Sequence, residues 1–85
     1  MIFNKIQSII TEVMIMEKDD VTRDSLLTEE LLCNEIDMQD IMRSLEDEFD
    51  VNIKDINKFI DQCEKVQDIV DLLMPYVRQK ELNEK

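Results

Sequence analysis

The central part of the chain carries the clearest helical pattern of apolar and polar residues. Within residues 34–50 one apolar stripe recurs at helical spacing, formed by Met38, Ile41, Met42, Leu45 and Phe49. Asn34 is a good N-cap in front of this stripe. Glu35 and Asp37 place negative charge at the positive end of the helix dipole. The pattern predicts an amphipathic helix around which the other elements are organised.

Two further stripes predict a first helix over residues 2–16 and a last helix that begins near residue 65. The first stripe consists of Ile2, Phe3, Ile6, Ile9, Ile10 and Val13, and the last of Val66, Ile69, Val70, Leu73 and Val77. Pro75 cannot donate a helical hydrogen bond, so we expect it to end or kink the last helix. Residues 55–60 predict a short helix with Ile56, Phe59 and Ile60 buried, after an extended link over residues 51–53.

These elements predict an all-α fold, a small four-helix bundle with three longer helices and one short third helix. A long first loop covers residues 17–30, where Val21, Leu26 and Leu27 are candidates to anchor it on the helices. The chain has no internal repeat, and we expect a single domain over residues 1–77 with a polar, flexible tail over residues 78–85.

Composition supports a helical protein. The 85 residues include no Gly and one Pro, which argues against an all-β fold with many tight turns. The hydrophobic fraction of 44% excludes a wholly disordered chain. With no signal peptide and no run that approaches a membrane span, we expect a cytoplasmic protein in which Cys33 and Cys63 are free thiols. Two cysteines without histidine offer no standard zinc site, so no metal is expected.

The charge is strongly negative, at a formal −11, and residues 35–50 supply −6 of it through seven acids and Arg43. This balance disfavours nucleic acid and anionic membrane as partners and favours a basic protein surface. Opposite the central apolar stripe lie Asp40 and Asp47, while Ile36 points to this acidic side. An apolar residue inside a charged rim is a common interface pattern, although a solvated helix face also explains the acids.

The segment Leu45-Glu46-Asp47-Glu48-Phe49, followed by a link that ends in Ile53, resembles the acyl carrier protein family. That family carries Leu-Glu-x-Glu-Phe late in its second helix. Residues 21–25 are similar to the loop after its first helix, and residues 29–31 to the approach to its second. The resemblance covers about residues 2–77 and implies the same bundle.

The family's hallmark is Asp-Ser-Leu at the start of the second helix, where the serine carries phosphopantetheine. Counting back from Leu45 puts Glu35 at the serine position, between Asn34 and Ile36. A carboxylate cannot be the acceptor, so no cofactor is expected. Leu32 stands where the family usually has glycine, and Arg43 where it generally has an apolar residue. Glu35 itself is open to three interpretations: a first-turn acid, the relic of a lost carrier site, or a charge that mimics the phosphodiester.

A second copy of the hallmark occurs literally at Asp24-Ser25-Leu26. If Ser25 were the modified residue, the second helix would start ten residues early and Asn34 would lose its capping role. We therefore prefer the register with Glu35 at the helix start. Under the alternative, Ser25 carries phosphopantetheine.

Three functional hypotheses follow, and none is enzymatic, because no nucleophile–base pair is visible. The first is a monomeric docking module that meets the basic surface of a synthase, ligase or transferase. Its expected contact residues are Glu35, Ile36, Asp37, Asp40, Arg43, Glu46 and Asp47. The second is a working carrier of acyl or aminoacyl groups in fatty acid, polyketide or related biosynthesis, modified at Ser25. The third is a structural or regulatory subunit that buries Ile36 in an oligomer.

Overall fold

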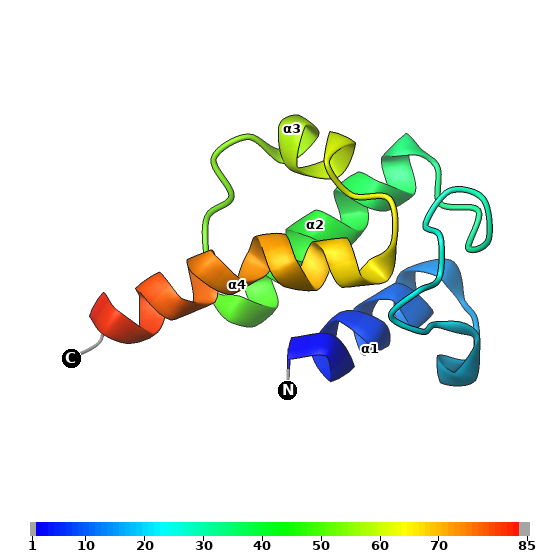
Figure 1. The fold of residues 1–85 in the computed structure, drawn as a ribbon, viewed down its shortest axis with the longest axis horizontal. Helices are drawn as coiled ribbons and strands as arrows, with labels where there is room; N and C mark the ends of the chain where they lie inside the picture. The colour runs from blue at the N-terminus through cyan, green and yellow to red at the C-terminus, as the bar shows by residue number, and fades with distance from the viewer. Residues whose placement is uncertain (1, 84–85) are drawn as a thin grey trace.

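A computed structural model describes residues 2–83, which form an all-helical bundle (Figure 1). The helices are α1 (Ile2–Met14), α2 (Glu35–Phe49), α3 (Ile56–Asp61) and α4 (Val66–Asn83), with a 3-10 helix η1 (Lys18–Asp20) in the first loop. The described residues contain no strand, so the predicted small helical bundle with a short third helix is confirmed. None of the described helices is long and apolar enough to cross a membrane.

The helices pack around one apolar core. α1 contacts both α2 and α4, and α3 lies against α2 (Figure 1). The side chains with almost no exposure come from the three predicted stripes and the first loop: Ile6, Ile10, Val21, Leu27, Ile41, Met42, Leu45, Val66, Ile69 and Leu73. Burial of such side chains stabilises the fold by about 1.5–3 kcal/mol each, which is why the stripes dictate how the helices face one another.

The first loop is attached to the start of α4 by backbone hydrogen bonds. The N–H of Leu27 donates to the carbonyl of Glu64 at 2.9 Å, and the N–H of Val66 donates to the carbonyl of Ser25 at 3.1 Å. Val21 and Leu27 are buried, as predicted, whereas Leu26 is only half-buried. These contacts hold the long first loop in one conformation against the bundle.

Among the described residues, three adopt left-handed backbone angles: Ile15 (φ 53°), Leu32 (φ 59°) and Asp50 (φ 52°). Asp50 tolerates this conformation and caps the C-terminus of α2. For residues like Ile15 and Leu32 the left-handed conformation costs about 1–2 kcal/mol. The first helix accordingly ends at Met14, two residues before the predicted limit, because Ile15 leaves the helical conformation.

α4 does not end at Pro75 but continues to Asn83, so of the two outcomes expected at this proline, an end or a kink, the end is wrong. Side chains after Pro75 explain the continuation. Tyr76 and Val77 pack against the core, and the Tyr76 ring meets Phe59 edge-on at 6.2 Å. One turn further, Lys80 Nζ binds the Asp50 carboxylate at 2.6 Å.

Residues 78–83, predicted as a flexible tail, are therefore helical, while residues 84–85 lie outside the described part of the chain. The Lys80 ammonium also holds the pKa of Asp50 below its usual range, through a hydrogen bond and its charge.

Candidate functional site

The start of α2 is built by a capping box. Asn34 Oδ1 accepts the N–H of Asp37 at 2.8 Å, and Asp37 Oδ2 accepts the N–H of Asn34 at 3.0 Å. This arrangement satisfies N–H groups that a helix start leaves free. Asn34 is the predicted N-cap, and Glu35 is the first residue of α2, with its side chain exposed.

Apolar contacts under this helix start fix its direction. Cys33 precedes the N-cap and Met38 follows four residues after it, and both are buried, in the positions of a hydrophobic staple. Burial, with the nearby charge of Asp37, raises the pKa of the Cys33 thiol to about 11. Cys33 therefore acts as a small apolar residue and is a poor nucleophile at neutral pH.

The residues predicted to bind a partner divide into two groups. Glu35, Asp40, Arg43 and Asp47 are exposed, and Ile36 is exposed over 68% of its surface. These five side chains are free to meet another molecule.

Asp37 and Glu46 are half-buried and have partners within the chain. Asp37 belongs to the capping box, and Glu46 Oε2 accepts the N–H of Ile53 at 2.8 Å. Glu46 thus ties α2 to the link before α3, a role that the helical pattern did not predict.

Leu32 is an exposed apolar residue beside this helix start that sequence reasoning did not place among the contact residues. It is 73% exposed, whereas the adjacent Leu31 is buried. The sequence does not show whether Leu31 or Leu32 is buried, because the direction of each side chain depends on the left-handed backbone conformation at Leu32.

A pocket of about 570 Å³ opens between the start of α2 and α3. It is lined by Thr28, Cys33, Asn34, Glu35, Met38, Asn57, Ile60 and Asp61. Its lining combines apolar residues with the two acids Glu35 and Asp61, so the pocket is lined in part by negative charge.

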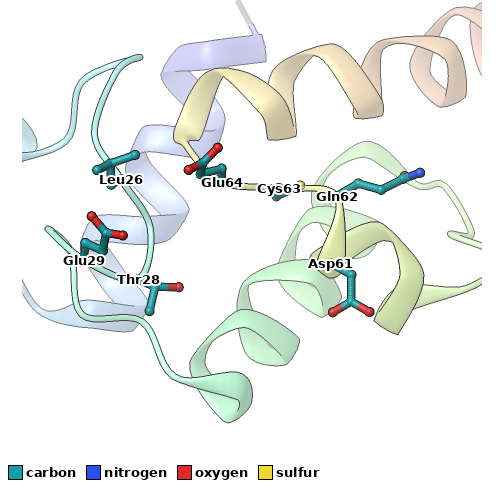
Figure 2. Close-up of a pocket in the computed structure, with 7 residues that line it drawn as sticks. All are labelled: Leu26, Thr28, Glu29, Asp61, Gln62, Cys63 and Glu64. Carbon is teal, nitrogen blue, oxygen red and sulfur yellow. The ribbon is translucent and has the colours of Figure 1, made fainter.

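A second pocket, of about 370 Å³, lies where the first loop faces the connection from α3 to α4 (Figure 2). Leu26, Thr28 and Glu29 line it from the loop, Asp61 from the end of α3, and residues 62–64 from the connection. Cys63 lies here, but its thiol donates to the carbonyl of Phe59 at 3.2 Å, and burial together with the charge of Asp68 raises its pKa to about 12. Within the described residues no group of three or more His, Cys, Asp or Glu side chains could hold a metal ion.

Ser25 lies in the first loop, away from the start of α2 and beside the start of α4, and is only 7% exposed. Its hydroxyl oxygen accepts the N–H of Thr22 at 2.9 Å and lies 3.0 Å from the Thr22 hydroxyl. The literal Asp24-Ser25-Leu26 sequence is therefore part of a hydrogen-bonded turn, ten residues before α2.

Comparison with known proteins gives several relatives named acyl carrier protein. The acyl carrier protein of Borreliella burgdorferi is 34% identical over 74 residues, which cover 85% of this chain and 88% of the relative. That of Lactobacillus acidophilus is 33% identical over 70 residues (82% and 81%), and that of Petrotoga mobilis 29% over 72 residues (85% and 82%).

No family model matches the chain. The relatives are carrier proteins and not enzymes, in agreement with the prediction that this chain is not an enzyme. A relative above 30% identity along most of both chains, together with the helical bundle and the Leu45–Phe49 segment, leads to one conclusion: the chain belongs to the acyl carrier protein family.

Proposed function

We propose that this chain is a docking module of the acyl carrier protein fold that has lost the acceptor for the prosthetic group. One observation carries the proposal. The capped start of α2, where the resemblance puts the phosphopantetheine-bearing serine, begins with the exposed carboxylate of Glu35. A carboxylate does not offer the hydroxyl that this attachment uses, so phosphopantetheine does not fit the residue present.

The environment of Ser25 also supports this proposal over modification at that serine. The Ser25 hydroxyl is buried and accepts a backbone hydrogen bond from Thr22. Attaching a phosphodiester there would break this bond and expose a segment whose backbone is joined to α4. An intramolecular hydrogen bond of this kind contributes about 0.5–1.5 kcal/mol to stability.

The surface around Glu35 supports docking to a basic partner. Exposed carboxylates of Glu35, Asp40 and Asp47 lie along the same helix as the exposed Ile36. Complementary charge raises the rate of encounter, and an apolar side chain within a charged rim supplies contact area. We name the surface formed by Glu35, Asp40 and Asp47 the acidic face. Glu35 keeps negative charge at the helix start, and Arg43 adds a positive charge on the same helix. The partner we propose is a synthase, ligase or transferase with a basic docking surface.

The decisive experiment restores the missing hydroxyl. Purified wild type, Glu35→Ser, Ser25→Ala and the double variant are incubated with coenzyme A and a broad-specificity phosphopantetheinyl transferase, and intact masses are recorded. We expect the phosphopantetheine increment on Glu35→Ser and on the double variant, and none on wild type or Ser25→Ala. Circular dichroism verifies that every variant is folded.

Each other outcome contradicts a defined part of the proposal. An increment on wild type that disappears in Ser25→Ala would restore the carrier function and place it at Ser25. A folded Glu35→Ser protein that gains nothing would show that the surface no longer docks to an enzyme of this class.

The role of the acidic face is measured in the Glu35→Ser background. Reversing charge with Asp40→Lys and Asp47→Lys should raise the KM for the carrier about tenfold at low salt, because a basic enzyme surface loses two attractive contacts. Glu12→Lys makes the same charge change as each single reversal, on the exposed part of α1, and is the matched control, with KM expected near the parent value. Equal KM values in all these variants would rule out the acidic face as the docking surface.

A further inference from the structure

Leu32 combines two unfavourable properties in one residue. Its backbone is left-handed (φ 59°), and its side chain is 73% exposed. The conformation is unfavourable for a residue with a branched side chain and would cost glycine little. Burial does not offset this, because the side chain remains in water. Neither backbone preference nor core packing within this chain explains a leucine here.

The position of Leu32 is defined by the elements on both sides. Leu31 is buried in the core, and Cys33 is buried beneath α2, where its N–H donates to the carbonyl of Leu27 at 2.9 Å. Leu32 is held between these two anchored residues, two positions before the N-cap Asn34. The last part of the first loop leads directly into α2 (Figure 1), so Leu32 stands beside the helix start on a well-anchored backbone.

The second exposed apolar residue of this region, Ile36, follows Glu35 in the first turn of α2. Leu32 and Ile36 therefore flank position 35 along the chain, and we name them the apolar pair. Exposed acidic residues within three positions of one of them along the chain are Glu29, Glu30 and Glu35. Exposed large apolar residues inside a charged rim are typical of an interface in which the apolar groups become covered.

From these observations we infer that the apolar pair is a contact point for the partner, with Leu32 inserted into an apolar recess that basic residues of the partner surround. The inference rests on the proposed docking function and adds to it a specific anchor and the shape that the partner must have. Any enzyme acting on a side chain at position 35 must approach that residue closely, so its surface covers the neighbouring side chains.

A second copy of this chain is a poor occupant, because two such surfaces would bring the carboxylates of Glu29, Glu30 and Glu35 against one another. Like charges brought together in this way oppose association. A basic partner meets the same carboxylates with attraction.

The test uses the Glu35→Ser protein and the same phosphopantetheinyl transferase, with KM for the carrier and thermal stability measured together. Leu32→Gly should raise KM five- to tenfold while raising the melting temperature, since it removes the contact and relieves the backbone. Leu32→Ala should raise KM by a similar factor without the gain in stability, because its Cβ keeps the strain. Such opposite changes in stability and binding are not expected from a residue that only shapes the fold.

Ile15→Gly is the matched control. Ile15 is also left-handed and 90% exposed, at the end of α1, so glycine should raise the melting temperature there and leave KM unchanged. The inference is wrong if both Leu32 variants keep the parent KM while Asp40→Lys and Asp47→Lys raise it, an outcome that leaves the proposed function intact. If Glu35→Ser is never modified, the proposed function fails and this inference with it. Sedimentation that shows a dimer dissolved by Leu32→Gly would overturn partner docking in favour of self-association.

Discussion

At the scale of single residues, the absence of glycine has a measurable consequence. Ile15 ends α1 in a left-handed conformation although it is β-branched, which makes it one of the least suitable residues for that position. We predict that Ile15→Gly raises the free energy of unfolding by about 0.5–1 kcal/mol. Glycine removes the backbone strain of about 1–2 kcal/mol. Part of this gain is lost because glycine gives the unfolded chain more conformational entropy. Urea unfolding of the purified variant measures the change.

Ile15→Ala is the control for this prediction, because it removes the exposed side chain but keeps the Cβ that causes the strain. Its stability should stay close to that of wild type. If alanine stabilised as much as glycine, the benefit would come from removing an exposed apolar side chain and not from the backbone.

At the scale of helices, the start of α4 depends on one carboxylate. Asp68 Oδ2 accepts the N–H of Lys65 at 3.0 Å and the N–H of Glu64 at 2.9 Å, and these two bonds hold the pKa of Asp68 below its usual range. A carboxyl whose pKa is lower in the folded than in the unfolded state stabilises the fold above the unfolded pKa. That stabilisation is lost as the pH falls through the folded pKa.

We therefore predict that Asp68→Asn lowers the free energy of unfolding by about 0.5–1 kcal/mol at pH 7, and that the difference from wild type shrinks below about pH 4. Urea unfolding from pH 7 to pH 2.5 measures it. Glu12→Gln, which removes an exposed charge from α1 away from its first turn, is the control. A difference that stays constant down to pH 2.5 would mean that Asp68 acts through packing and not through its charge.

At the scale of the whole molecule, the formal charge of −11 opposes compact folding by self-repulsion. The ion pairs that the structure describes, Lys5 with Glu48 at 3.6 Å and Lys80 with Asp50, lie at the surface and offset only a small part of this repulsion. We predict that the melting temperature rises by roughly several degrees between about 0.05 and 0.5 M salt, because salt screens the repulsion. Calorimetry in sodium chloride and in potassium chloride should give the same rise.

Replacing Asp40 and Asp47 by Asn should reduce this response to salt, since it removes two charges from the densest acidic surface. A melting temperature that falls with salt would contradict the prediction and assign the larger effect to the attractive ion pairs.

Most of the fold follows from patterns that act over short distances along the chain. The three apolar stripes predict α1, α2 and α4, and Asn34 with Asp37 predicts where α2 begins, because side chains three or four residues apart meet on one helix face and a cap reaches only its own first turn. The Leu45–Phe49 segment likewise identifies the family and places Glu35 at the helix start. None of these conclusions needs a contact between distant segments.

Features that depend on contacts between distant segments could not be predicted in this way. The burial of Ser25 results from a loop joined to α4, and the continuation of α4 past Pro75 from contacts of its later turns with Phe59 and Asp50. The exposure of Leu32, and not of Leu31, results from a left-handed turn between two buried residues. In each case local preference allows several outcomes, and packing between segments far apart in the chain selects one of them. For this reason the acidic helix could be found from the residues alone, while its apolar neighbour Leu32 became visible only in the folded molecule.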